Sequence, residues 1–302
     1  MRAILIGLSV LLAAPATAQD AYPAEGDLPA QPAVSRPATP IPPEQFDKMV
    51  PKHPGQLGVL APANIHKPRP KPPFDLTGTW FVDLRGGFTN FMFGPPYPKF
   101  YKQGRQALID SAKAAAAGKT YRDAIGQCYP PGMPMIMTRV WPQNFIQLPT
   151  AIFMISAFNN SVRTIFMDGR QHTDPDIVVP SYNGESVGHW EGDTLVVDTS
   201  YFEPENHYID MGIPISDQFH MVERITLLDA GKTMQIEYIM TDPDMWQGEW
   251  RSTKRFLRED QTDINEAECI LQYNEHLPGT ELGSETAKER GQTELKGVPN
   301  AK

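Results

Sequence analysis

The chain has 302 residues, 40% of them hydrophobic, and a formal net charge of −9 at pH 7, enough for one large domain or two small ones. Its lysines and arginines are scattered singly, which argues against a nucleic-acid partner because phosphate binding requires a basic stripe. There is no polybasic segment or amphipathic helix suited to a membrane surface, so we expect a small molecule as the partner.

The first eighteen residues have the pattern of a secretory signal peptide. Arg2 gives a short positive start, Ala3–Ala14 is an apolar run, and Ala16-Thr17-Ala18 supplies small residues before a cleavage site. The run is too short for a helix that spans the ~30 Å of a bilayer, so no membrane insertion is expected after cleavage. We therefore predict a periplasmic or secreted protein.

The next segment, residues 19–74, is rich in proline, as in Pro68-Arg69-Pro70-Lys71-Pro72-Pro73. Because proline lacks an N–H and fixes φ, neither a helix nor a central strand is expected there. We predict an extended leader of polyproline II character, which serves as a spacer or wraps the surface of the folded domain.

The folded domain is expected over residues 75–277 and begins with a strand at Gly78-Thr79-Trp80. A Gly-x-Trp sequence in the first strand resembles the opening of lipocalin-like (calycin) barrels. In that family the Trp closes one end of the barrel, and a basic residue of the last strand stacks over it. The resemblance implies that Trp80 takes this position, with Arg251 or Arg255 as the cation.

An aromatic stretch at residues 88–101 follows, in a Gly- and Pro-rich context that prevents a regular strand. We expect it to cover the barrel mouth above an apolar pocket. Phe91, Phe93 and Tyr97, together with Trp190, are the residues predicted to bind a hydrophobic or aromatic ligand.

One helix, from about Tyr101 to Lys119, precedes a region in which strands predominate. Apolar runs bounded by turn residues, and alternation with a period of two, predict strands at Ile146–Leu148, Ile152–Phe158, Val162–Asp168, Val187–Trp190, Thr194–Thr199, Phe219–Leu228, Thr233–Met240 and Trp250–Leu257. About nine strands at this spacing predict a mainly β fold, an antiparallel lipocalin-like barrel or curved sheet with one helix. The polar tail at 278–302 is expected to be disordered.

The chain contains two cysteines, Cys128 and Cys269, and neither lies in a C-x-x-C motif. In an oxidising compartment an even pair of cysteines usually forms a disulfide rather than a reactive thiol. We therefore predict a structural bridge between them.

Three motifs between residues 75 and 275 resemble a group of exported bacterial proteins of unknown function. They are Cys128-Tyr129-Pro130-Pro131-Gly132-Met133-Pro134, Asp168-Gly169-Arg170 and Gly188-His189-Trp190-Glu191-Gly192-Asp193-Thr194-Leu195-Val196-Val197-Asp198-Thr199; Ser216-Asp217, His220 and Glu223-Arg224 fit the same pattern. The resemblance supports the limits of the domain and implies no particular activity.

Polar residues concentrate between Arg163 and Arg224, where His172, His189 and His220 occur among several carboxylates. This set suits general acid–base chemistry or, with the histidines as ligands, a catalytic zinc site. The histidine spacing matches no metal motif, so no metal is predicted. The chain has no G-x-S-x-G elbow and no glycine-rich phosphate loop, so neither a serine nucleophile nor a nucleotide cofactor is expected.

His220 is the best candidate for the acid or base. In the strand Phe219–Leu228 it shares a face with Arg224, which would hold an anionic or carbonyl group of the ligand if that face points into the barrel. The opposite face is more apolar, and if it points inward, both residues lie in solvent. Arg170 and His172 are predicted to form a second polar cluster.

These residues predict an exported enzyme that acts on a hydrophobic or aromatic small molecule by cofactor-independent acid–base chemistry, as a lyase, isomerase or hydrolase. A non-catalytic carrier of a hydrophobic ligand is the alternative, because it needs only the pocket, and a metal-dependent hydrolase is a further one. Replacing His220 by Ala separates the first two, since a carrier keeps its ligand whereas the enzyme loses ~10²–10⁴ in rate.

Overall fold

The computed structural model describes residues 42–45, 55–87, 92–117, 125, 128–210, 212–267 and 269. The chain divides into two compact units, 1–55 and 56–302. In the first unit, residues 43–45 form one helical turn, in which Gln45 N–H donates to the carbonyl of Pro42 (2.9 Å). The predicted signal peptide at 1–18 and polar tail at 278–302 lie outside the described residues and stay predictions.

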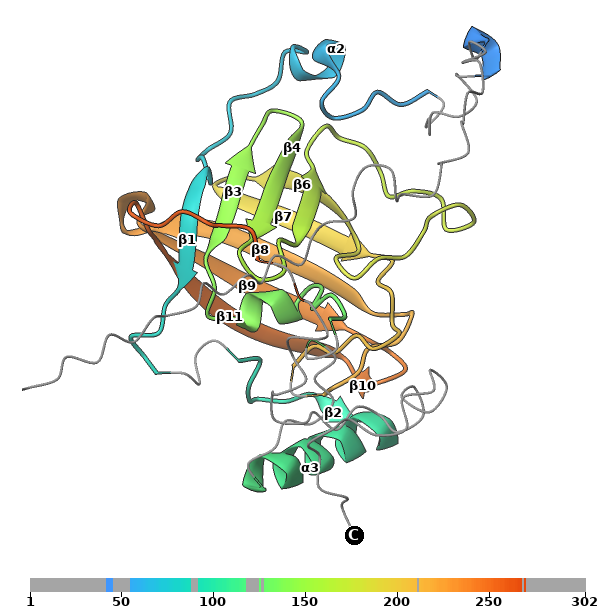
Figure 1. Ribbon diagram of the computed structural model, residues 1–302, viewed down its shortest axis with the longest axis vertical. Coiled ribbons are helices and arrows are strands. Elements are labelled where there is room, and N and C mark those ends of the chain that lie inside the picture. Colours follow the sequence, from blue (N-terminus) through green and yellow to red (C-terminus); the bar gives the residue numbers. More distant parts are fainter. Residues whose placement is uncertain are drawn as a thin grey trace, which may run out of the picture. The chain divides into compact units, whose positions relative to one another are not determined.

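The second unit contains a closed barrel of nine strands, which confirms the predicted mainly β, lipocalin-like architecture (Figure 1). In chain order the strands are β1 (Gly78–Val82), β3 (Gln143–Gln147), β4 (Ala151–Ser156), β5 (Val162–Phe166), β6 (Glu185–Glu191), β7 (Thr194–Ser200), β8 (His220–Leu228), β9 (Thr233–Thr241) and β11 (Glu249–Arg258). Their order around the barrel is β1-β11-β9-β8-β7-β6-β5-β4-β3, and pairing of β1 with β3 closes it.

One strand pair departs from the antiparallel pattern. β5 and β6 pair in parallel, with Ile165 opposite Ser186, whereas the other pairs around the barrel are antiparallel. Parallel neighbours need a connection that returns along the sheet rather than a tight hairpin. Residues 167–184 make this crossing, and they carry two of the predicted site residues, Arg170 and His172.

Two short strands, β2 (Lys99–Phe100) and β10 (Trp246–Gln247), form a separate antiparallel sheet beside the helix α3 (Lys102–Ala116) (Figure 1). α3 is the long helix that the sequence predicts between residues 101 and 119. Two 3₁₀ turns, η3 (Met135–Thr138) and η4 (Asp229–Gly231), complete the described elements of this part of the chain. Among the described helices, none combines the length and apolar character of a transmembrane segment.

The leader contains one helical turn, α2 (Pro62–Ile65), so the expectation that no helix forms there is wrong at this position. Pro62 occupies the first turn, where its missing N–H would have no intrahelical partner in any case. The segment also contacts the barrel, since the hydroxyl of Thr150 donates to the carbonyl of Val59 (2.6 Å). The second half of the leader therefore contacts the barrel.

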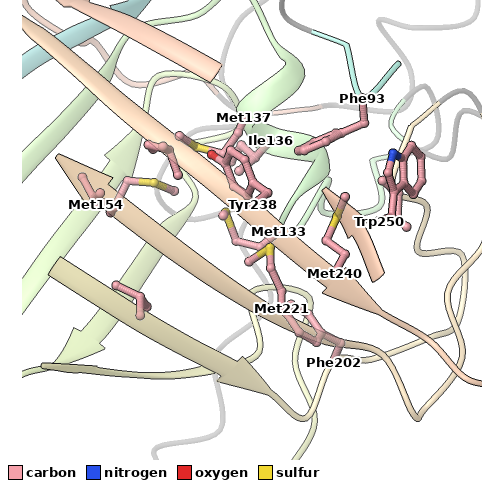
Figure 2. Packing of buried hydrophobic residues seen from close by; sticks show 14 of the residues in the cluster. Phe93, Met133, Ile136, Met137, Met154, Phe202, Met221, Tyr238, Met240 and Trp250 are labelled. Atoms are coloured by element: carbon pink, nitrogen blue, oxygen red, sulfur yellow. The ribbon is translucent and has the colours of Figure 1, made fainter. Parts of the chain in front are cut away.

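The interior of the barrel is filled by the inward side chains of its strands. In β9, Met234, Ile236, Tyr238 and Met240 are buried, as the alternating sequence predicts. Figure 2 shows methionine and aromatic side chains packed around Tyr238, among them residues of the segment that precedes β3. Complete burial of a large apolar side chain such as methionine or isoleucine stabilises the folded state by about 1.5–3 kcal/mol.

Trp80 is fully buried, and the guanidinium of Arg258 lies 4.3 Å from the centroid of its ring. The calycin resemblance predicts such a cation–π contact from the last strand, but the prediction of Arg251 or Arg255 is wrong. Side chains alternate along β11. Arg258 lies on the same face of β11 as the buried Phe256, whereas Arg251 and Arg255 lie on the opposite face and are exposed.

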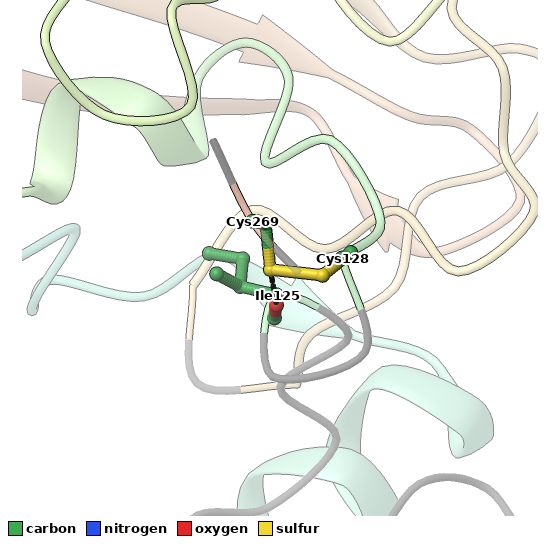
Figure 3. Close-up of a disulfide and its surroundings, with 3 residues drawn as sticks. All are labelled: Ile125, Cys128 and Cys269. Carbon is green, nitrogen blue, oxygen red and sulfur yellow. Dashed lines mark hydrogen bonds between the residues drawn. A yellow bond between two sulfur atoms is a disulfide. The ribbon is translucent and has the colours of Figure 1, made fainter. Parts of the chain in front are cut away.

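Cys128 and Cys269 form the predicted disulfide, with Cα atoms 5.4 Å apart (Figure 3). Sγ of Cys269 also lies 3.7 Å from the carbonyl oxygen of Ile125. The two cysteines are 141 residues apart in the sequence. Closing a loop of this length lowers the conformational entropy of the unfolded chain, which stabilises the folded state by about 5 kcal/mol on the chain-entropy model. The bridge ties the segment before η3 to the chain that follows β11.

Candidate functional site

Two histidines converge on one aspartate on the outer face of β7 and β8. Oδ1 of Asp198 lies 2.8 Å from Nε2 of His172, and both of its carboxylate oxygens lie 3.0 Å from Nε2 of His220. On the other side of His172, Nδ1 lies 3.0 Å from Oε2 of Glu185. These four residues, here named the histidine–carboxylate cluster, bring together two histidines that the sequence singles out separately.

The strand register explains how the cluster forms. Asp198 of β7 lies opposite Val222 of β8, so His220, two residues along the same face, is its diagonal neighbour. Glu185 is the first residue of β6, which pairs with β7. His172 comes from the connection 167–184 that the parallel pairing of β5 and β6 requires.

Alternation along β8 places the cluster outside the barrel. Met221, Glu223 and Ile225 are buried, and His220 and Arg224 occupy the opposite face. Of the two orientations that the sequence leaves open, the observed one has the apolar face inward. The cluster is accessible from solvent, since the His220 side chain is 37% exposed and its aspartate partner 36%.

Hydrogen bonding gives the two histidines different roles. Carboxylate oxygens only accept, so Nε2–H of His220 donates to Asp198, while its Nδ1 makes no hydrogen bond with the described residues. A carboxylate that orients one ring nitrogen and leaves the other for proton transfer is the arrangement of catalytic dyads and triads. Both nitrogens of His172 face carboxylates, so this residue links the two acids instead.

Electrostatics favour ionised carboxylates in the cluster. Burial raises the pKa of Asp198, but hydrogen bonds from His220 and His172 outweigh burial and hold the pKa below its ordinary value. For Glu185 burial again raises the pKa, and hydrogen bonds from the hydroxyl and N–H of Thr173 and from His172 lower it overall. Two ionised acids stabilise positive charge that develops on a neighbouring imidazole.

The two predicted arginines take other positions. Nη1 of Arg224 lies 2.9 Å from Oε2 of Glu191, and Arg224 is four residues from His220, about 13 Å along an extended strand. Arg170 donates to both carboxylate oxygens of Asp168 (2.8 and 2.7 Å). In the described part of the chain neither arginine contacts the cluster, so neither is placed to hold an anion beside it.

The aromatic residues predicted to bind a ligand separate into two places. Phe93 is buried, and it packs edge-on against Trp250, as Tyr97 also does. Trp190 packs against the end of the leader instead. Phe91 lies outside the described residues. The aromatic group near Trp250 is thus part of the core, and Trp190 belongs to a different region.

A second polar group lies inside the barrel, and the sequence analysis did not identify it. Arg163 of β5 and Glu223 of β8 form a buried bidentate ion pair. The guanidinium also donates to the hydroxyls of Ser186 and Thr199, each at 3.0 Å. The available signal was a charged residue on the apolar face of an alternating strand, because Glu223 stands between two apolar residues that share its face.

Within the described residues, no three His, Cys, Asp or Glu side chains are arranged as a metal site. In the cluster both ring nitrogens of His172 are taken by carboxylates. His189, the third histidine considered as a ligand, lies apart and contacts Glu191, with 3.2 Å between Nε2 and Oε1.

No family model matches this chain, and a search of curated proteins finds no match either. Of the two polar groups, the outer cluster is accessible and holds two of the predicted catalytic residues.

Proposed function

We propose that the protein is an enzyme in which His220 acts as general acid or base, oriented by Asp198. The observation that carries the proposal is the contact of His220 Nε2 with both oxygens of Asp198 at 3.0 Å, with Nδ1 of the same ring left for a substrate. Proton transfer of this kind needs no cofactor. The reaction class is that of a lyase, isomerase or hydrolase.

The surroundings of the cluster support a hydrophobic or aromatic small molecule as substrate. The ring of Tyr201 lies edge-on to His172, with 5.8 Å between ring centroids. The connection that continues from His172 exposes the apolar side chains of Ile177 and Val179. Apolar contacts beside a few oriented polar groups are typical of small-molecule sites.

We also propose that the protein works outside the cytoplasm, after cleavage of the signal peptide at 1–18. The disulfide between Cys128 and Cys269 supports this proposal, because such bonds persist in oxidising compartments and are rare in the cytosol.

The experiment compares His220→Ala with His189→Ala. His189 is a matched control, because it is an exposed histidine that contacts a carboxylate outside the cluster. Purified full-length protein is incubated in D₂O with a panel of aryl ketones and aryl esters, and deuterium uptake and hydrolysis are followed by NMR. We expect His220→Ala to lose about 10²–10⁴-fold in rate and His189→Ala to keep the rate of the unmodified protein.

Equal rates in the two variants would overturn the proposal. Retention of a bound aryl compound by His220→Ala, with no turnover by either variant or the unmodified protein, would indicate a carrier. Turnover that chelator treatment abolishes and zinc restores would indicate the metal-dependent alternative.

A further inference from the structure

Lys254 lies inside the barrel, on the inward face of β11, and is only 1% exposed. Its Nζ is 4.1 Å from the centroid of the Phe93 ring. In the register of β11 with β9, Ser252 lies opposite Tyr238. Lys254 and Tyr238 are therefore diagonal neighbours on the same face of adjacent strands. Proteins almost never bury a lysine this completely unless it is paired, and the charge of Asp210 acts on this one.

Tyr238 is fully buried, and its hydroxyl has no hydrogen-bond partner among the described residues. Its pKa lies well above the ordinary value, because of burial and the nearby charge of Glu223. The phenol therefore stays protonated and is available as a donor. An enclosed donor without a partner is rare in folded proteins.

The ring of Phe93 fills the space beside Tyr238 and Lys254, and so indicates the shape of a group that would fit there. It packs edge-on against Tyr238, with 5.1 Å between centroids, and lies 6.3 Å from Trp250 (Figure 2). The same ring faces the amine of Lys254. A ligand that replaces the Phe93 side chain is therefore aromatic, and a substituent on its ring meets Nζ.

The chemistry of Lys254 indicates which substituent this is. Burial lowers the pKa of its amine to about 7, and the charge of Asp210 acts in the opposite direction but less strongly. A large fraction of the amine is thus unprotonated near neutral pH, and an unprotonated amine is a nucleophile rather than an anion-binding group. An electrophilic carbon fits such a group better than a carboxylate does.

We propose that Lys254 forms an imine with an aromatic aldehyde or ketone inside the barrel, with the hydroxyl of Tyr238 as the donor to the carbonyl oxygen. The nitrogen lone pair attacks the carbonyl carbon to form a carbinolamine. One proton moves from nitrogen to oxygen in the carbinolamine, and the second N–H proton follows when the C=N bond forms and the oxygen leaves as water. Hydrolysis reverses the reaction, so no oxidant or reductant is consumed. This site is separate from the cluster around His220.

The test traps the imine. Full-length protein with its disulfide intact is incubated near neutral pH with benzaldehyde and sodium cyanoborohydride, whose hydride reduces C=N to a stable benzylamine. The modified lysines are then identified by mass spectrometry. We expect Lys254 to be labelled about tenfold or more above the exposed Lys113, because exposed amines are ordinarily protonated at this pH. Label confined to exposed lysines would overturn the proposal.

Two variants sharpen the result. Phe93→Ala vacates the space that the ligand's ring takes, so labelling of Lys254 should increase severalfold. Tyr97→Ala is the matched control, because Tyr97 packs on Trp250 in the same aromatic group, whereas the ring beside the amine is that of Phe93. Labelling of Lys254 in this variant should equal that in the unmodified protein. An equal response in the two variants would contradict the role given to Phe93. The readout is a covalent label, so it is independent of turnover by His220.

Discussion

Strands β6, β7 and β8 carry polar residues on both faces, and the two faces differ in how completely those residues are paired. On the inner face are Ser186, Thr199 and Glu223, and on the outer face are Glu185, Asp198 and His220. The inner three all bond to Arg163 in the absence of solvent. The outer three form a chain through His172 that leaves one ring nitrogen of His220 without a partner in the described structure.

The difference shows that burial, rather than residue type, decides what a polar group can do here. A buried ion pair loses its hydration, and it persists only where further hydrogen bonds satisfy the guanidinium and the carboxylate. Such a buried ion pair determines how the strands pack, and its hydrogen-bonding groups are already engaged within the protein and do not bind a substrate. The outer cluster keeps partial contact with water, so its histidine can exchange protons.

The largest expected effect comes from breaking the inner pair. Glu223→Gln leaves the guanidinium of Arg163 buried without a counter-charge, and we expect a loss of about 3–5 kcal/mol in the free energy of unfolding. The matched control is Glu191→Gln, which breaks the exposed pair with Arg224 and should have little effect on stability, because water screens the two charges. Urea denaturation of both variants measures the difference. Equal losses would mean that the inner pair is no more important to folding than the surface pair.

A fully buried histidine extends the comparison to pH. Burial lowers the pKa of His207 from the ordinary 6.5 to about 4, although hydrogen bonds with the carbonyls of Glu203 and Met133 act in the other direction. Between these two values the unfolded chain binds a proton that the folded chain does not. The contribution of His207 to the free energy of unfolding is fully present above about pH 6.5. It falls by about 3 kcal/mol as the pH drops to about 4.

Urea denaturation across this pH range measures the loss. In a His207→Gln variant we expect a lower stability at neutral pH and a flatter dependence on pH, because the titrating group is gone. A variant curve parallel to that of the unmodified protein would show that other groups cause the acid sensitivity.

Much of the barrel could be predicted because each strand has one apolar face. The predicted Thr194–Thr199 and Thr233–Met240 each differ from the observed strand by a single residue. Alternation reports which residues share a face, and apolar content then indicates that this face points inward. The same rule places Arg258, rather than its exposed neighbours, over Trp80.

The parallel pairing of β5 and β6 could not be predicted. The connection 167–184 has the composition of a long loop, and nothing in that composition specifies the end of the barrel to which the chain returns. The cluster was predicted only in part for the same reason. His172 and His220 are identifiable by residue type, but the roles of Asp198 and Glu185 depend on strand register and on this connection.

The smallest expected effect on stability comes from Asp198→Asn. Asp198 is partly exposed and its pKa is held below the ordinary value, so its ionic contribution is present at neutral pH and is lost as the pH falls below about 4. Because water screens such contacts, we expect the variant to lose less than about 1 kcal/mol in the free energy of unfolding at neutral pH. Asp193→Asn, in the β6–β7 turn, is the matched control.

Activity should respond far more than stability. The amide that replaces the Asp198 carboxylate has one acceptor and one donor group for two imidazole rings, so one ring must present an unprotonated Nε2 to the amide. If that ring is His220, its proton moves to Nδ1 and the base is lost, which lowers the rate in the D₂O assay by about 10²–10⁴-fold. Ring ¹⁵N shifts of His220 report this change of tautomer directly. A variant that keeps both the tautomer and the rate would show that Asp198 does not orient His220, and would place the outer cluster, like the inner one, among the groups that only support the fold.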